Sequence, residues 1–177
     1  MNTPFLQRLV GVITFKAPIY REIAHDPEAL RPAALVVLIS SLIAGVAQVL
    51  FVPQVGFWGL VAQLVVGILA WLIGSFVVAF IVANLFKGKT DTGEMLRILG
   101  HLSVFNVLAI IPCIGGIAGL VLSAAGLVIA IRESAELATD KAIIAAIAVF
   151  VVSFVIGLLI GLIFGVGAAG IAVLSQR

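Results

Sequence analysis

Three polar residues stand close together in an otherwise apolar part of this chain: His101, Ser103 and Asn106. An imidazole can change its charge near neutral pH because its unperturbed pKa is ~6.5, and hydroxyl and amide groups both donate and accept hydrogen bonds. Such side chains could line a polar groove for a small solute. In an α-helix Ser103 and Asn106 lie three residues apart on one face, whereas His101 and Ser103 lie on different faces.

The alternative to a groove is ordinary packing, and we favour it. Polar side chains inside a membrane form hydrogen bonds between helices that are worth ~0.6 kcal/mol each. The polar set within the apolar stretches is small and neutral: Gln48, Gln63, Asn84, His101, Asn106 and scattered serines.

The residue patterns of an enzyme, a proton pump or a metal site are missing from the sequence. No Asp, Glu, Lys or Arg lies deep inside an apolar stretch, although proton-coupled carriers place ionisable groups along their path. The zinc-protease pattern HExxH, the nucleophile pattern GxSxG and a glycine-rich phosphate loop are absent. His25 and His101 have no Cys, His or carboxylate at ligand spacing. We therefore expect no catalytic residues, no cofactor and no metal.

Four long uncharged stretches must position these polar groups: 33–52, 57–86, 98–131 and 142–175. A membrane span needs ~20 apolar residues to cross ~30 Å of hydrocarbon. Pro112 and the pair Gly115 and Gly116 break the third stretch, so we interpret it as two helices. The sequence predicts an all-α, polytopic membrane helix bundle with five transmembrane helices, at about 33–52, 57–86, 95–111, 114–131 and 142–173.

The third predicted helix, at about 95–111, is the most polar of the five. It is barely long enough to cross the hydrocarbon. Two arrangements are open: a thin crossing, or a re-entrant hairpin with the next helix whose irregular tip is buried in protein.

The composition is that of an integral membrane protein, with 63% hydrophobic and 10% charged residues. The formal net charge of +2 does not indicate nucleic-acid binding, because the basic residues alternate with acidic ones and suit anionic lipid head groups. The single cysteine, Cys113, excludes an intrachain disulfide. We divide the chain into an N-terminal segment, 1–32, and a five-span domain, 33–177.

The basic residues also predict an orientation. Under the five-span threading, nine of the ten Lys and Arg residues fall on one face of the membrane: Arg8, Lys16, Arg21, Arg31, Lys87, Lys89, Arg97, Arg132 and Lys141. The positive-inside rule makes that face cytoplasmic. We therefore expect the N-terminus inside, the C-terminus outside, and a prokaryotic cytoplasmic membrane as the location.

The N-terminal segment is amphipathic and is not a cleavable signal peptide, since Arg8, Lys16 and Pro18 interrupt its apolar run. It predicts a helix that is kinked or restarted near Pro18. This helix lies on the cytoplasmic leaflet or packs under the bundle, and the sequence does not separate the two. Asp26-Pro27-Glu28 is typical of a helix start, as is Asp91 placed three residues before Glu94.

Rows of small residues predict close helix contacts. Gly115, Gly119 and Ser123 form one row, and Gly157, Gly161 and Gly165 form another, both at four-residue spacing. Such rows let two helix backbones approach each other. Packing inside one bundle and contact between copies in a homo-oligomer both explain them.

Three stretches of the chain resemble the Yip-domain family of integral membrane proteins: KAPIYREIAHDPEALRPAALVVLI (16–39), TDTGEMLRILGHLSVFNVLAIIPCIGG (90–116) and IRESAELATDKAI (131–143). Gly100-His101 stands where family members often have Gly-Tyr. The long N-terminal region of eukaryotic members is absent, so the resemblance is to the short prokaryotic branch. It implies a role in membrane organisation or a trafficking-type process, and Rab binding is not carried over to this chain.

We accordingly expect a non-enzymatic membrane scaffold or adaptor, whose partners are membrane lipids and other membrane proteins or a second copy of the chain. The alternative is a small-solute transporter or channel that uses the third and fourth helices. A polar cavity near mid-membrane favours the transporter, and a solid interior favours the scaffold.

Overall fold

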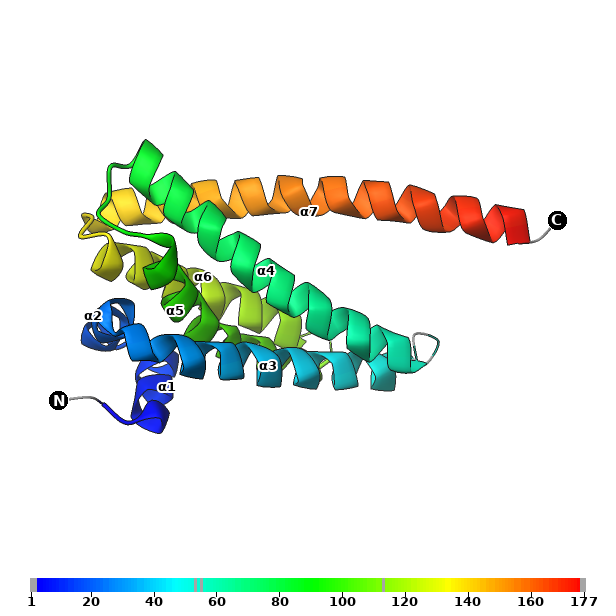
Figure 1. Cartoon of the computed structure of the whole chain (residues 1–177), viewed down its shortest axis with the longest axis horizontal. Helices are drawn as coiled ribbons and strands as arrows, with labels where there is room; N and C mark the ends of the chain where they lie inside the picture. Colours follow the sequence, from blue (N-terminus) through cyan, green and yellow to red (C-terminus); the bar gives the residue numbers. More distant parts are fainter. Residues whose placement is uncertain (1–2, 53, 55, 113, 176–177) are drawn as a thin grey trace.

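The chain folds into a helical bundle, seen in the computed structural model of Figure 1. The structure describes the backbone of residues 3–52, 54, 56–112 and 114–175, and the side chains of these residues except 157 and 159–175. In chain order the elements are α1 (Phe5–Ile13), α2 (Ala17–His25), the 3-10 turn η1 (Pro27–Ala29), α3 (Leu30–Phe51), α4 (Gly56–Leu85), α5 (Thr92–Leu102), the 3-10 helix η3 (Ser103–Ile110), α6 (Ile114–Ser134) and α7 (Thr139–Ser175). The described residues form no strand, so the predicted all-α fold is confirmed.

Five helical segments of the described chain are long and apolar enough to cross a membrane: Pro27–Phe51, Gly56–Leu85, Thr92–Ile110, Ile114–Ser134 and Thr139–Ile156. Each overlaps one predicted crossing. In Figure 1 α4 runs obliquely to α3, and α7 diverges from α4 toward the C-terminus. The five-span plan predicted from the sequence is therefore confirmed by length and composition.

The third span combines two kinds of helix. The side chain of Asp91 accepts a hydrogen bond from the backbone N–H of Glu94 (2.7 Å), as the sequence predicted, and starts α5. After Leu102 the chain tightens into η3. A 3-10 helix rises about 2.0 Å per residue against 1.5 Å for an α-helix, so α5 and η3 together reach about 32 Å. This length matches the ~30 Å of hydrocarbon and favours a crossing over a re-entrant hairpin.

The N-terminal segment forms two short helices joined by a tight turn. Phe15 has a positive φ of 56° in this turn, and Pro18 follows in the first turn of α2, where a proline is tolerated. The predicted restart near Pro18 is confirmed. Asp26 then accepts from the N–H of Glu28 (3.0 Å) and begins η1, as the sequence predicted.

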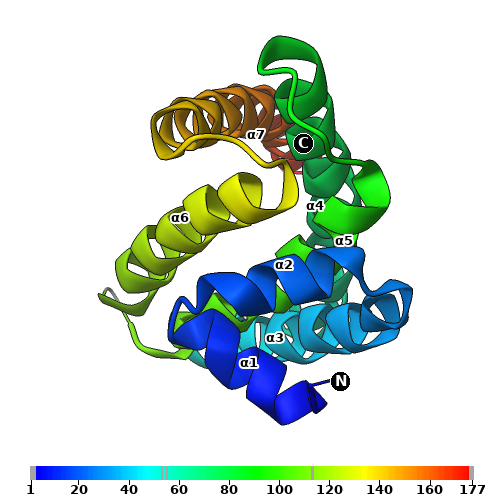
Figure 2. The same cartoon turned by 90° about the vertical axis from the view of Figure 1, so that its left-hand side faces the viewer.

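The two N-terminal helices are placed differently. Tyr20 and Ile23 of α2 are fully buried, and the Tyr20 hydroxyl donates to the carbonyl of Val12 (3.0 Å). Figure 2 shows α2 across the end of the bundle, where it contacts α5 and α6. In contrast, α1 exposes Leu6 and Val10, at 70% and 54%. Thus α2 packs under the bundle, while α1 keeps an uncovered apolar face.

The core is concentrated at this same end. Tyr20 and Ile23 belong to one buried cluster with Met95 and Ile98 of α5 and Ile131 of α6. Residues on both sides of the division at 32 and 33 therefore share one core.

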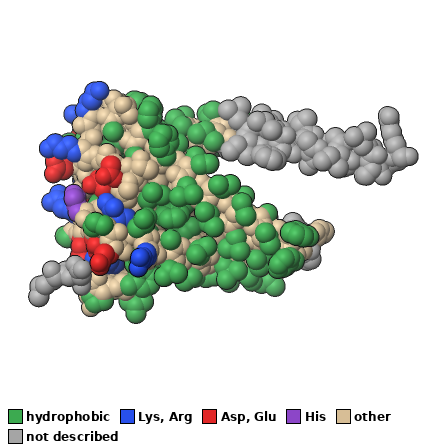
Figure 3. All heavy atoms as spheres, viewed as in Figure 1, with side chains coloured by type: hydrophobic (Ala, Val, Ile, Leu, Met, Phe, Trp, Pro, Cys, Tyr) green, Lys and Arg blue, Asp and Glu red, His purple; other side chains and the backbone are tan. Residues whose placement is uncertain are grey.

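Charged side chains gather at the end of the bundle that carries α2 and the α4–α5 and α6–α7 links, as Figure 3 shows for the visible face. The opposite part of that face is hydrophobic and neutral. We call the first part the charged end.

Candidate functional site

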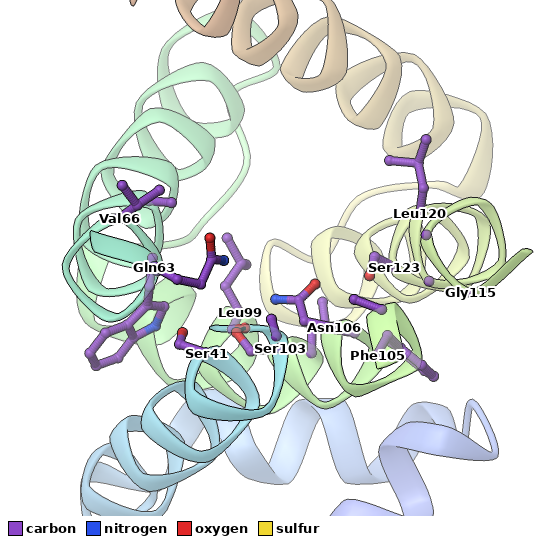
Figure 4. A pocket seen from close by; sticks show the side chains of 18 of the residues that line it. Ser41, Gln63, Val66, Leu99, Ser103, Phe105, Asn106, Gly115, Leu120 and Ser123 are labelled. Atoms are coloured by element: carbon purple, nitrogen blue, oxygen red, sulfur yellow. Dashed lines mark hydrogen bonds between the residues drawn. The ribbon is translucent and has the colours of Figure 1, made fainter. Parts of the chain in front are cut away.

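A cavity of about 530 Å³ lies inside the spanning bundle, and we call it the mid-bundle cavity. Its walls come from α3, α4, α5, η3 and α6, with Phe150 of α7 at its edge. Val66 on α4 and Leu120 on α6 stand on two sides of it (Figure 4), and they are 55% and 58% exposed. The space is thus accessible from outside the bundle.

Two amide side chains reach into the middle of the cavity. Gln63 comes from α4 and Asn106 from η3, and Figure 4 shows them pointing toward each other from opposite walls. The hydrogen bonds nearby stay on the walls, as with Ser103 Oγ, which donates to the Leu99 carbonyl (3.1 Å), and Trp71 Nε1, which donates to the Leu96 carbonyl (2.8 Å). No such bond joins either amide to another described side chain drawn in Figure 4.

Three hydroxyl groups complete the polar lining: Ser41 of α3, Ser103 of η3 and Ser123 of α6. The described lining contains no Asp, Glu, Lys, Arg or His. These two amides and three hydroxyls are neutral, and each has at least one donor and one acceptor. The Trp71 indole N–H, which also lies in the lining, is a donor only and is already bonded to the Leu96 carbonyl.

The 3-10 geometry explains how η3 lines the cavity. Side chains three residues apart eclipse one another in a 3-10 helix. Ser103, Asn106 and Ala109 therefore form one row along η3, and all three line the cavity. The sequence predicted an α-helix here, in which a row at three-residue spacing drifts around the helix.

Small residues set how closely the cavity walls approach. A Cβ on Gly67 of α4 would overlap Ser41 Oγ of α3, and a Cβ on Gly115 of α6 would overlap the Leu108 carbonyl of η3. A Cβ on Gly119 would lie 2.9 Å from the Phe105 carbonyl. The structure thus places Gly115 and Gly119 against η3. The second predicted row, Gly157, Gly161 and Gly165, lies outside the described side chains.

His101 does not line the mid-bundle cavity. It is fully buried in α5, with its ring centroid 6.4 Å from that of Phe5 in α1. Its Nδ1 lies 2.8 Å from the Arg97 carbonyl, and Nδ1 must donate because a carbonyl oxygen only accepts. Its Nε2 has no partner among the described residues. The structure therefore brings Ser103 and Asn106 together and separates His101 from them.

Sequence reasoning missed the other half of the polar lining. Gln63 belonged to the intramembrane polar set but was not assigned to the groove, and Ser41 counted only among scattered serines. Ser123 was assigned to the small-residue row of Gly115 and Gly119 and not to the groove. Gln48 and Asn84, of the same residue types, do not line the cavity; exposure alone does not separate them from Asn106, which is also exposed. A usable signal was the small residue Gly67, one turn after Gln63, which marks the face of α4 that packs against α3.

The comparisons with known proteins identify the family. The model of the Yip1 domain matches residues 10–173, nearly the whole chain. The chain belongs to the Yip1 domain family. No curated protein and no solved structure matches this Yip1-domain chain. The resemblance found in the three sequence stretches is thereby confirmed.

A second polar feature of this Yip1-domain protein lies at the charged end. Arg8 of α1 is buried, and its guanidinium forms ion pairs with two carboxylates: Glu22 of α2 (3.0 Å) and Asp26, which directly follows α2 (2.6 Å). Thr3 adds two bonds to Glu22, from its N–H (3.0 Å) and its hydroxyl (2.6 Å). Arg97 of α5 donates to the Ala24 carbonyl in the last turn of α2. These contacts fix α1 and α2 to the spanning bundle.

The carboxylates of this cluster have shifted pKa values. Burial by itself would raise the pKa of Glu22, but hydrogen bonds from Thr3 and Arg8 outweigh it and lower that pKa below its ordinary value. Burial by itself would also raise the pKa of Asp26, but hydrogen bonds from Arg8 and from the Glu28 N–H outweigh it and lower that pKa as well. Both groups are therefore held as carboxylates by the fold.

Ion pairs also join the loops of the charged end. Glu133, near the end of α6, pairs with Arg21 of α2 (3.2 Å) and with its neighbour Arg132 (2.9 Å). Lys89 of the α4–α5 link pairs with Glu136 of the α6–α7 link (3.2 Å). The Lys89 N–H also donates to the Ala135 carbonyl (3.1 Å). The described residues contain no cluster of three or more His, Cys, Asp or Glu that could hold a metal.

Proposed function

We propose that this Yip1-domain protein is a non-enzymatic scaffold or adaptor of a prokaryotic cytoplasmic membrane, acting in membrane organisation or a trafficking-type process. In this proposal the charged end faces the cytoplasm, with the N-terminus inside and the C-terminus outside. Its partners are membrane lipids and other membrane proteins, or a second copy of the chain.

The observation that carries the proposal is the ordered surface at the charged end. Four segments far apart in sequence build it: α1, α2, the α4–α5 link and the α6–α7 link. Ion pairs and hydrogen bonds hold them together, while the side chains of Arg21 and Lys89 are 61% and 83% exposed. A rigid surface with exposed charges selects partners by charge complementarity.

The interior is not packed solid as expected for a scaffold, because the mid-bundle cavity lies there, and by that criterion it favours a transporter. The neutrality of its lining nevertheless supports the scaffold over an ion- or proton-coupled carrier. The described lining of the mid-bundle cavity contains no ionisable side chain, whereas proton-driven carriers and pumps place such groups along their path. His101, the buried ionisable group of the third span, lies outside the cavity lining.

Reporter fusions test the orientation. Fusions after Lys89 and Lys141 are expected to report a cytoplasmic position, and a fusion after Arg177 an external one. A cytoplasmic signal at Arg177 contradicts the five-span orientation.

Charge reversal at the exposed surface tests the adaptor role. Lys89→Glu with Lys141→Glu changes two exposed cations and leaves the buried cluster around Arg8 intact. In-cell crosslinking followed by purification in mild detergent should lose the protein partners of the wild type in this variant. The control, Lys89→Arg with Lys141→Arg, should retain them. Identical partner sets in both variants overturn the adaptor proposal.

A small-solute transporter is the second candidate, and the mid-bundle cavity with its five neutral polar side chains is the observation that favours it. Uptake of neutral solutes into proteoliposomes tests this directly. Uptake that requires the wild-type protein and is abolished by Asn106→Leu would support the transporter function over the adaptor function.

A further inference from the structure

We propose that the mid-bundle cavity binds an uncharged acylglycerol, a lipid with at least one free hydroxyl group, which enters from the bilayer. This inference concerns the interior of the spanning bundle and is independent of the adaptor role proposed for the charged end.

The size and position of the cavity suit a membrane amphiphile. Its volume of about 530 Å³ lies within the ~300–1,000 Å³ of small-molecule sites. Ser41, Gln63 and Ser123 come from the inner turns of three spanning helices, away from the charged end. Exposed Val66 and Leu120 beside the cavity make it accessible from outside the bundle.

The polar groups exclude a charged occupant. A charged head group without a partner of opposite charge costs several kcal/mol in hydrocarbon, and the described lining offers no such partner. Free phosphate and the anionic head groups of phospholipids therefore have no basis for recognition here.

The polar groups of the cavity need an occupant that both donates and accepts hydrogen bonds. The amides of Gln63 and Asn106 each carry a carbonyl acceptor and an NH₂ donor and point into the same space (Figure 4). Unsatisfied polar groups are costly in hydrocarbon. A quinone offers acceptors only and leaves both amide carbonyls unpaired. A free hydroxyl beside ester carbonyls, as in an acylglycerol, satisfies both halves of each amide.

Apolar side chains of the cavity walls provide a surface for the acyl chains. Leu99, Leu102 and Phe105 line the cavity on one side and Leu120 and Leu127 on the other. Acyl chains move to these side chains from the surrounding lipid, which is equally apolar, so their binding gains little hydrophobic free energy. The hydrogen bonds of the head group therefore decide the affinity.

Native mass spectrometry of the detergent-solubilised full chain with 1,2-dioctanoylglycerol tests the proposal. Wild type is expected to bind one molecule. Gln63→Leu and Asn106→Leu should each weaken binding about fivefold to tenfold, the effect of losing a hydrogen bond to a neutral partner. Gln48→Leu and Asn84→Leu are the matched controls, because these amides are exposed, as Asn106 is, but do not line the cavity. Both controls should bind as the wild type does.

A cavity-filling variant makes the test independent of the amides. Gly116 lines the cavity and a Cβ there meets no atom within 4 Å, so Gly116→Leu adds a bulky side chain to the lining and its Cβ displaces no neighbour. It should abolish binding. Gly74→Leu, equally unobstructed and outside the lining, should not. Thermal melting of each variant verifies that it is folded.

Competition with other lipids tests which chemical class of lipid the cavity binds. Phosphatidylglycerol and a short-chain quinone are expected not to displace dioctanoylglycerol. Displacement by either lipid, or equal binding by Gln63→Leu, Asn106→Leu and the wild type, overturns the proposal. Absence of any bound dioctanoylglycerol on the wild type overturns the proposal too.

Discussion

Gly67 of α4 lies directly against Ser41 of α3: a Cβ on Gly67 would overlap the Ser41 hydroxyl oxygen and would lie 2.9 Å from the Ser41 Cβ. Rotation of the hydroxyl removes the first clash but not the second. The two helices therefore depend on a glycine at this position to form one wall of the mid-bundle cavity.

Gly67→Ala should destabilise the bundle by about 1–3 kcal/mol, the usual cost of overpacking a close contact. Gly74→Ala on the same helix meets no atom within 4 Å and should be neutral or stabilising, since alanine has the higher helix propensity. Thermal melting in detergent measures both. A lowered melting temperature in both variants would mean that the Ser41 contact is not the cause.

Replacement of Arg8 should loosen the N-terminal helices. Arg8→Met leaves Glu22 and Asp26 without their cation, and their side chains are only 28% and 16% exposed. We expect a loss of about 2 kcal/mol, below the ~3–5 kcal/mol of a fully buried pair because Glu22 stays partly in water. Proteolysis should then cut near the Phe15 turn faster than in the wild type. Arg21→Met is the control and should behave as wild type, because the Arg21 side chain is 61% exposed and Glu133 keeps Arg132 as a partner.

Stability should fall at acid pH through the same cluster. The pKa values of Glu22 and Asp26 are lowered in the folded chain, so at low pH the unfolded chain binds more protons. The contribution is complete above the ordinary values of 4.5 and 3.8 and is lost as the pH falls through the lower folded pKa values. Melting temperatures between pH 6 and pH 3 measure this decline. Glu22→Gln with Asp26→Asn should flatten it; an unchanged decline in that variant assigns it to other groups.

His101 should be dispensable for the cavity. Its Nε2 is buried without a described partner, so His101→Phe removes an unsatisfied polar atom from an apolar contact with Phe5. We expect equal or higher melting temperature and unchanged lipid binding. Loss of binding in His101→Phe but not in Gln63→Leu would place the site near α1 instead.

The sequence predicts the spans well because hydrophobic length is a local property. The start of α5 at Asp91 and the restart near Pro18 follow equally from local capping and proline chemistry. The 3-10 form of η3 does not follow from local chemistry, and the close packing of Gly115 and Gly119 against η3 joins segments whose contact the sequence does not show.

The candidate site was predictable only in part for a similar reason. Ser103 and Asn106 are three residues apart and share a row under either helical geometry. Their partners Gln63 and Ser41 come from other helices, and one sequence does not show which faces of two apolar helices meet. His101 was grouped with them by proximity in sequence, whereas the helix turns it toward α1.

The docking of α2 beneath α6 has a consequence for biosynthesis. Tyr20 packs close to Gly126, where a Cβ would lie 3.2 Å from the Tyr20 hydroxyl oxygen. At ~5–20 residues per second, the ribosome needs roughly 5–20 s to make the intervening chain. During that interval Tyr20 and Ile23 have no α6 surface to cover them, so the nascent N-terminus must rest on the lipid surface or be shielded by an insertion factor until the fourth span is in place.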